Sequence, residues 1–461
     1  MKRIFTLAAI LLAANAFAQS GGIDASLLDE LREGYEGTAS DKAIRNALNG
    51  TPIATLAMNA DRSGMIDTHF TYTVPTKGRT NQQSSGRCWL FSGLNVLRAS
   101  AIAGHDLGDF TFSQNYLFFY DQLEKANLFL QGIIDTKDLP IDDRKVDWLF
   151  HNPISDGGTF AGVMDLVDKY GLVPSEAFPE SYTANHTQAM RGQLGTLLRQ
   201  YGMRLRQAYE KDGKKADLQG LKEEQLKSIY RLLVLFLGEP PTEFEWTRCD
   251  SKGEVVDTKT YTPKSFFDEY VGEPLSDRYV MLMNDPVREY YKVYRIDFDR
   301  HVYDGTDWVY LNLPVDEIKE MAIASIKDST AMYFSCDVGK FLIRDKGVCD
   351  IANFDYESLL GVTFDMDKKE RIQTGASGSS HAMTLIAVDI KDGAPVKWMV
   401  ENSWGASTGY KGNIIMTDEW FDEYMFRLVV DKKYVPSGVQ ELYSQEPILL
   451  PAWDPMFAEE E

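Results

Sequence analysis

The hydrophobic pattern of this 461-residue chain changes character along its length, and this change most restricts the folds open to it. In the first two thirds, apolar residues recur every three or four positions, as at Leu90, Leu94 and Leu97, which is the spacing of one helix face. Beyond about residue 300 they gather in short runs between Gly-rich turns, which is typical of strands. The sequence therefore predicts a chain of class α+β.

The expected elements follow from these patterns. Helices are predicted at 88–100, 114–126, 161–170 and 315–327. Strands are predicted at 308–313, 331–335, 381–388, 397–400 and 413–416. Residues 180–300 are rich in Lys, Arg, Glu, Gln and Leu with helical spacing, so we expect a mainly helical segment there. Residues 20–70 are weakly patterned and predict loops and short helices.

The N-terminus has the pattern of a secretory signal. Lys2 and Arg3 precede the apolar run Ile4–Leu12, and Ala16-Phe17-Ala18 has the small-x-small form of a signal-peptidase site. We interpret residues 1–18 as a signal peptide cut after Ala18, which predicts an exported, periplasmic protein; the alternative is an ordinary amphipathic helix. The apolar run is too short to span a bilayer comfortably, and no later segment reaches about 20 uninterrupted apolar residues.

Charge and cysteine usage exclude several classes of function. The formal net charge is −21, whereas nucleic acids and anionic membranes are bound by clustered Lys and Arg, so neither is expected as a partner. The four cysteines form no CxxC pair or metal knuckle, which argues against a metal site and against a disulfide framework. Two alternatives stay open for Cys336 and Cys349, which either pair or are buried as small apolar side chains.

Cys88 is the candidate nucleophile. It follows the polar, flexible stretch 83–87 and begins the helical pattern, so it lies at or near a helix N-terminus. The positive end of the helix dipole favours the thiolate, which is the reactive form. Most cysteines at helix starts are structural, so the assignment depends on the flanking residues.

Gln82 is the candidate oxyanion donor. It lies six residues before Cys88, where its side-chain amide can fold back beside the thiol. Acyl transfer at a peptide carbonyl needs donors aimed at the developing oxyanion, and this amide with the Cys88 backbone N–H supplies them. Gln83 is the neighbouring alternative, and alternation along the chain points it elsewhere.

His381 has the setting of a catalytic base among the six histidines. It follows the Gly- and Ser-rich stretch 375–380 and begins an apolar strand, where a ring is both held and reachable. Asn402 follows the next strand and is expected to bond the ring nitrogen that does not face the thiol. Trp404 then shields that hydrogen bond from water. The structural alternative is a histidine that merely starts a strand.

The order Gln82, Cys88, His381, Asn402 resembles that of papain-like cysteine peptidases, and further motifs resemble the bleomycin hydrolase and aminopeptidase C branch. The residues around the nucleophile are SSGRCW, which differs from the papain signature CG[SA]C[WY]. The further matches run from about Thr80 to the C-terminus: Ser113–Phe119, Leu123–Asn127, Asp156–Gly158, Lys169–Gly171, Phe267–Val271, Cys336–Lys340, His381–Thr384, Asp418–Tyr424 and Leu450–Met456.

This resemblance implies a two-lobed papain-like core, with a helical lobe and an antiparallel β lobe. The domains are then 19–179 with the nucleophile, a helical insertion at 180–300, and 301–461 with the base and a C-terminal arm. Cys88 and His381 are 381 − 88 = 293 residues apart, roughly 150 more than in simpler papain relatives, and the insertion holds most of the excess. In the resembled family such insertions build a homohexamer.

The implied function is a cysteine aminopeptidase of short peptides that works through an acyl-thioester and needs no metal or organic cofactor. A papain-like endopeptidase would share every catalytic residue, and a catalytically silent assembly protein is the third alternative. The family pattern and this chain differ at two places. The signal peptide is unlike the cytosolic members, and the tail Phe457–Glu461 reads FAEEE where small apolar residues are usual. We expect either that this tail blocks the cleft or that it is a frayed acidic end.

Overall fold

The computed structural model describes residues 21–454 and 456, which form two compact units. The first unit comprises the N-terminal residues to Met58 together with 355–362, and the second holds the rest. The expected signal peptide 1–18 and the tail 457–461 lie outside the described residues. The second unit carries every candidate site residue.

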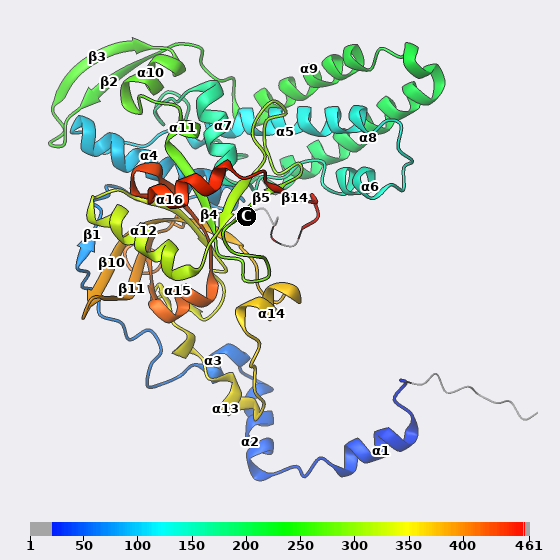
Figure 1. The fold of residues 1–461 in the computed structure, drawn as a ribbon, viewed down its shortest axis with the longest axis vertical. Coiled ribbons are helices and arrows are strands. Elements are labelled where there is room, and N and C mark those ends of the chain that lie inside the picture. Colours follow the sequence, from blue (N-terminus) through cyan, green and yellow to red (C-terminus); the bar gives the residue numbers. More distant parts are fainter. Residues whose placement is uncertain (1–20, 455, 457–461) are drawn as a thin grey trace, which may run out of the picture. The chain divides into compact units, whose positions relative to one another are not determined.

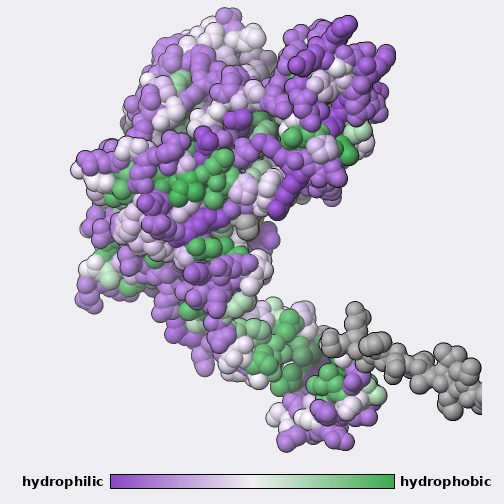
Figure 2. Space-filling model, turned by 45° about the vertical axis from the view of Figure 1, so that its right-hand side comes forward, coloured by the Kyte–Doolittle hydropathy of each residue, from purple (hydrophilic) through white to green (hydrophobic). Residues whose placement is uncertain are grey.

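The first unit consists of short helices. They are α1 (Ala25–Glu33), α2 (Ala39–Leu48), α3 (Ile53–Ala57) and α13 (Tyr356–Leu360). Thr38 caps α2 with a capping box, in which its side chain and that of Asp41 bond each other's backbone N–H. None of the residues of α1 and α2 is buried, and the face drawn in Figure 2 shows hydrophobic atoms gathered on this unit.

The helical lobe of the second unit is centred on α4 (Cys88–His105). This helix is apolar on nearly all sides, because it packs against strand β10, β7, α5 and α7. The other helices of the lobe are α5 (Gln114–Asp135), α6 (Arg144–His151) and α7 (Phe160–Tyr170). Helix α5 continues nine residues beyond the predicted end at 126, since its second half is also apolar and buried.

Residues 180–300 contain more than helices. The helices are α8 (Gln188–Asp212), α9 (Leu218–Leu237), α10 (Pro263–Tyr270) and α11 (Leu275–Arg278), with α8 and α9 beside α5 (Figure 1). A separate hairpin is formed by β2 (Phe244–Cys249) and β3 (Val255–Tyr261). The buried strands β4 (Tyr279–Met283) and β5 (Lys292–Ile296) were not predicted, and both join the main sheet.

The main sheet has the order β14-β5-β6-β4-β13-β7-β10-β11-β12-β9-β8, with β1 (Tyr72–Thr73) also paired to β10. Its remaining strands are β6 (Val309–Asn312), β7 (Met332–Cys336), β8 (Leu342–Ile343), β9 (Val348–Cys349), β10 (His381–Lys391), β11 (Ala394–Glu401), β12 (Asn413–Thr417), β13 (Met425–Asp431) and β14 (Ile448–Leu450). Most pairs are antiparallel, and β4–β6, β5–β14 and β9–β12 are parallel.

Helices cover this sheet and the predicted α+β class is confirmed. Helices α12 (Val315–Lys327) and α15 (Asp418–Tyr424) contact its strands, and the remaining helices of the second unit are α14 (Lys368–Gln373) and α16 (Ser437–Glu441). Helix α12 has the predicted bounds, and each predicted strand overlaps an observed one. No helix in the described part of the chain is both long enough and apolar enough to cross a bilayer.

Candidate active site

Cys88 is the first residue of α4, and the fold brings it to the start of β10. Its side chain is fully buried. The backbone N–H of Ala382 donates to the Cys88 Sγ at 3.5 Å, and Ala382 is the residue that follows His381. At the first position of a helix no intrahelical carbonyl can accept the Cys88 N–H. The thiol therefore lies beside the expected base.

His381 and Asn402 are bonded as the sequence predicts. The His381 Nε2 lies 2.8 Å from the Asn402 Oδ1, and the Ser403 backbone N–H donates to the same oxygen at 2.8 Å. Because an amide oxygen only accepts, Nε2 must carry the proton in the neutral imidazole, and Nδ1 is left as the ring's acceptor. Antiparallel strands β10 and β11 hold the two residues together, although they are 21 positions apart.

Trp404 covers the imidazole. Its ring centroid lies 4.9 Å from that of His381, with the planes tilted by 32°. His381 and Asn402 are both buried, whereas Trp404 is only partly buried. The indole therefore lies between the His381–Asn402 pair and solvent, which is the shielding role expected from the sequence.

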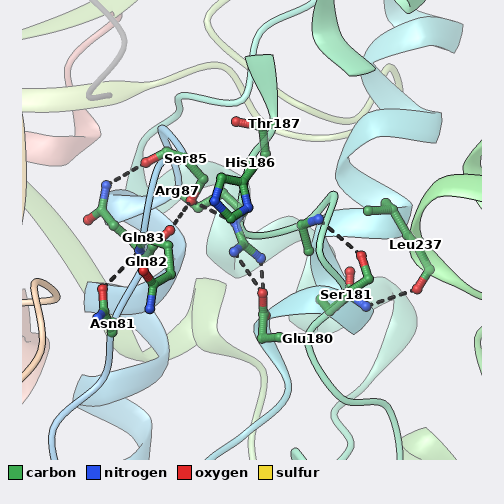
Figure 3. A network of polar contacts seen from close by, with 12 residues as sticks. Asn81, Gln82, Gln83, Ser85, Arg87, Glu180, Ser181, His186, Thr187 and Leu237 are labelled. Atoms are coloured by element: carbon green, nitrogen blue, oxygen red, sulfur yellow. Dashed lines mark hydrogen bonds and ion pairs between the residues drawn. The ribbon is translucent and has the colours of Figure 1, made fainter. Parts of the chain in front are cut away.

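Gln82 is held with its amide nitrogen toward the nucleophile loop. The Gln82 Oε1 accepts a hydrogen bond from the Ser403 hydroxyl at 2.6 Å, and the Gln82 Nε2 donates to the Ser85 carbonyl at 2.6 Å. A primary amide has two N–H donors, so one donor remains beyond the Ser85 bond. Gln83 is exposed and has a φ of +55°, so the two glutamines point apart (Figure 3).

The loop before the nucleophile is fixed by a buried arginine. Arg87 is fully buried, and its guanidinium donates two bonds to the Glu180 carboxylate, at 3.1 and 2.7 Å (Figure 3). Its Nε also donates to the Ser85 hydroxyl at 3.0 Å. Bidentate pairing of this kind fixes orientation as well as distance. The residue before Cys88 thus has a structural role that the sequence analysis did not assign.

Asp156 holds the same loop from the opposite side. Its Oδ2 accepts the Gly86 N–H at 2.8 Å, its backbone carbonyl accepts the Trp89 indole N–H at 2.9 Å, and Arg191 donates to its Oδ1 at 2.8 Å. A Cβ on Gly86 would lie 2.9 Å from the Asp156 carboxylate, so a larger residue there would displace this carboxylate from its hydrogen bonds. Asp156 and Ser403 were not assigned a positioning role from the sequence. Each lies in a short motif, Asp156 in DGG and Ser403 in ENSW beside Asn402, and this was the signal that could have indicated the role.

A cavity of about 700 Å³ lies next to the Asp156 loop. Its lining includes Ser155 and Arg191 near this loop, aromatic residues such as Trp148, and the C-terminal arm at Ala452–Asp454. The arm therefore runs along the wall of a hollow that begins beside the residues holding Gly86 and Trp89.

Within residues 21–454 and 456, one group has the spacing of metal ligands. Its members are Asp67, His69 and Asp389, whose ligand atoms lie within 4.8 Å of one another. The Lys397 ammonium lies 3.4 Å from the Asp389 carboxylate and 3.3 Å from that of Asp67. A cation would have to displace this ammonium, so the group is explained as an ion-pair cluster.

The other cysteines take no part in this constellation. Cys336 in β7 and Cys349 in β9 are buried, and no disulfide joins them. Burial raises the pKa of the Cys349 thiol well above its ordinary value, which keeps it protonated and unreactive. Of the two alternatives for this pair, burial as small apolar side chains is the one observed.

The site combines a thiol at a helix start with a neighbouring imidazole, whose Nε2 bonds the side-chain oxygen of an asparagine. This is the arrangement of a papain-type cysteine peptidase. The helical lobe that carries the thiol and the sheet that carries the imidazole are the two lobes of that class. Comparison with known proteins narrows this class to a family. Residues 22–457 match the model of the Peptidase C1-like family, and the chain belongs to that family.

Relatives of known name cover most of the chain. Bleomycin hydrolase of Rattus norvegicus is 41% identical over 401 residues, which is 84% of this chain and 88% of the relative. Aminopeptidase G of Lactobacillus delbrueckii subsp. lactis is 38% identical over 427 residues, covering 93% and 97%. The crystal structure of PepW from Lactobacillus rhamnosis HN001 superposes with a TM-score of 0.91 at 35% identity, covering 95% of this chain and all of that one. The predicted family is thereby confirmed.

Proposed function

We propose that this cysteine peptidase is an aminopeptidase that trims short peptides from the N-terminus. Its catalytic cycle is covalent. The Cys88 thiolate attacks the carbonyl carbon of the scissile bond, and protonated His381 delivers a proton to the leaving amine. Water activated by His381 then hydrolyses the acyl-thioester. Asn402 keeps the imidazole oriented through the 2.8 Å bond to Nε2.

The oxyanion of each tetrahedral intermediate is stabilised by two donors. One is the remaining N–H of the Gln82 amide, whose orientation is fixed by the Ser403 hydroxyl at 2.6 Å. The other is the Cys88 backbone N–H at the helix start. Preorganised donors of this kind cost no reorganisation during the reaction, which is why they account for a large share of the rate.

The course of the C-terminal arm is the observation that supports an aminopeptidase. Arg427 donates to the Met456 carbonyl at 2.7 Å, and Arg427 pairs in register with Ser335, which pairs with Ala382. Neighbouring strands are about 4.8 Å apart, so the backbone of Arg427 lies two strand spacings, roughly 10 Å, from that of Ala382, and the Arg427 side chain extends from there to the arm. The segment 457–461 that follows is long enough to reach the cleft, at about 3.3–3.6 Å per residue.

A chain segment in the cleft would limit the enzyme to substrates with a free N-terminus. Carboxylates of Glu459–Glu461 would pair with the ammonium group of such a substrate. The curated relatives include proteins named aminopeptidase C and aminopeptidase G, which agrees with this mode.

Deletion of residues 458–461 tests the assignment. The deletion retains Met456 and its bond to Arg427, so the anchored part of the arm stays in place. We expect slower release of N-terminal residues from free peptides and new cleavage of N-acetylated peptides, read by mass spectrometry. Equal kinetics of the parent and the deletion variant on both peptide sets would show that the tail does not set specificity, and cleavage of N-acetylated peptides by the parent would favour an endopeptidase.

Two further properties are proposed, the assembly from the resemblance and the export from the sequence of residues 1–18. We propose assembly as a homohexamer with most contacts from residues 180–300. Light scattering of the mature protein tests this assembly, and a monomer at micromolar concentration would contradict it.

We also propose export with cleavage after Ala18. N-terminal sequencing of the protein from a periplasmic fraction should begin at Gln19, and an intact Met1 in the cytoplasm would contradict export.

A further inference from the structure

A short hairpin carries an arginine to the ring that covers the catalytic imidazole. Strands β8 and β9 are antiparallel and are joined by the turn 344–347. The Arg344 Cζ lies over the Trp404 indole, 4.3 Å from the ring centroid, which is the geometry of a cation–π contact. Arg344 itself is exposed.

The turn is held against strand β12 and against the loop between Trp404 and that strand. The Gly347 carbonyl accepts the Ile415 N–H at 2.8 Å, and β9 pairs with β12. A Cβ on Gly347 would lie 2.6 Å from both the Asn413 carbonyl oxygen and the Tyr410 nitrogen, and its φ is +66°. Only glycine permits this approach, so the position of Arg344 over Trp404 is set by the backbone rather than by the arginine side chain alone.

Arg344 has no ion-pair partner in the described part of the chain. In the described ranges no carboxylate lies within ion-pair distance of its guanidinium, although the chain carries a net charge of −21. Lys346 in the same turn is directed elsewhere, because its ammonium donates to the Ser63 carbonyl at 3.1 Å, a bond that holds the side chain without neutralising its charge. Of the two cations in the turn, Arg344 is therefore the one that contacts the ring over the catalytic imidazole.

The direction of catalysis decides which part of a substrate meets this cation. The oxyanion donors Gln82 and Cys88 define one side of the scissile carbonyl, and His381 gives its proton to the leaving amine. The chain beyond the scissile bond therefore passes the imidazole and then Trp404, which covers it. Since Trp404 contacts both groups, at 4.9 Å and 4.3 Å, the guanidinium is no farther from the imidazole than these distances combined. One or two extended residues, at about 3.3–3.6 Å each, together with the length of a guanidinium–carboxylate pair cover that distance.

We propose that Arg344 is a specificity-determining residue that binds a carboxylate on the leaving-group side of the substrate, one or two residues beyond the scissile bond. This carboxylate is either the C-terminus of a di- or tripeptide or an acidic side chain. The inference rests on the proposed peptidase function and adds to it a preference for short or acidic peptides. Guanidinium–carboxylate hydrogen bonds are charge-assisted, and the planar guanidinium donors match the geometry of the two carboxylate oxygens. Stacking on the indole keeps the Arg344 guanidinium in place.

Three matched substrates test the proposal: a dipeptide X-Gly, its amide X-Gly-NH₂, and X-Asp-NH₂, with an aminoacyl-coumarin as reference. Arg344→Ala should lower kcat/KM about threefold to tenfold for either substrate with a carboxylate, mainly through KM. Arg344→Glu should lower it further, and Arg344→Lys should restore part of it. All three variants should cleave the coumarin and the X-Gly amide within about twofold of the parent, because neither carries the carboxylate. The X-Gly and X-Asp-NH₂ arms separate a C-terminal carboxylate from a side-chain carboxylate.

Lys346→Ala is the matched control, because it removes the same charge from the same turn. An unchanged ratio between X-Gly and its amide in Arg344→Ala, or an equal shift in Lys346→Ala, would overturn the proposal. Calorimetric binding of the same peptides to Cys88→Ala and to Cys88→Ala/Arg344→Ala gives the comparison without turnover. A failure of hydrolysis in the parent would count against the peptidase function, while the binding ratio would still decide the role of Arg344.

Discussion

Arg98 and Glu401 form an ion pair that is buried on both sides, with 2% and 0% of their side chains exposed. Arg98 lies on α4, the helix that begins with Cys88, and Glu401 ends β11 immediately before Asn402. Arg79 adds a second bond to the Glu401 carboxylate at 3.3 Å. The pair therefore ties the element of the nucleophile to the element that orients the base.

Removing one partner of this pair should cost more than removing both. Glu401→Ala leaves the Arg98 charge buried without its partner, and we expect a loss of about 3–5 kcal/mol in the free energy of unfolding. Replacing both by methionine removes both desolvated charges and should cost less. Urea denaturation followed by tryptophan fluorescence gives the comparison. A double variant less stable than Glu401→Ala would show that the pair stabilises through more than mutual compensation.

Cys88→Ala should abolish hydrolysis and leave the fold intact, because alanine is a good residue for a helix start and the thiol is replaced by a smaller apolar group. Activity on an aminoacyl-coumarin and circular dichroism are the two measurements. Alkylation of the parent with iodoacetamide should give the same loss, and alkylation of Cys336→Ala should give it equally. Residual turnover above about one percent would remove Cys88 from the role of nucleophile.

Gln82→Ala should lower kcat by about 10²–10³, as expected for loss of one oxyanion donor. Ser403→Ala should have a smaller effect in the same direction, since the amide stays but loses the 2.6 Å bond that orients it. Gln83→Ala is the control, because that side chain is exposed and points away. If Gln83→Ala lost as much activity as is expected of Gln82→Ala, the wrong amide would have been assigned.

Asp165→Asn should stabilise the protein at neutral pH. Burial raises the pKa of Asp165 to about 6, and the charges of Asp168 and Asp304 act in the same direction. Because the native pKa lies above the unfolded value, the native state binds the proton more tightly, and stability is lost as pH rises from about 4 to about 6. Asparagine carries no charge and can still accept the Thr306 N–H, which is 2.9 Å from the carboxylate. We expect a gain of roughly 1–3 kcal/mol at pH 7.5 that disappears near pH 4.

Asp304→Asn is the control for this effect. A hydrogen bond from the Lys169 ammonium lowers the pKa of Asp304, so this carboxylate stabilises the native state above the unfolded pKa, and its removal should give no gain at pH 7.5. Denaturation midpoints of both variants at pH 4 and pH 7.5 are the measurement. An Asp165→Asn gain that is equal at both pH values would assign the effect to packing instead of ionisation.

Some of the fold was readable from local sequence. The bounds of α12 and the starting residues of α4 and β10 follow from apolar spacing, which depends only on neighbours along the chain. Strands β4 and β5 were missed because they lie in a range dominated by helical composition, and their pairing with β13, β6 and β14 is non-local. The turn signal Asn284-Asp285-Pro286, which directly follows β4, was available and was not used.

The sequence by itself determined the chemistry: a cysteine at a helix start, a histidine at a strand start, and the amides of Gln82 and Asn402 in the order that the family shares. Only the tertiary structure decided how these groups are held, through Ser403 on Gln82, Glu401 on Arg98, and Arg344 on Trp404. The first two of these contacts join residues about 300 positions or more apart. Such contacts depend on sheet register and on which charges are buried together, and neither leaves a periodic trace in the sequence.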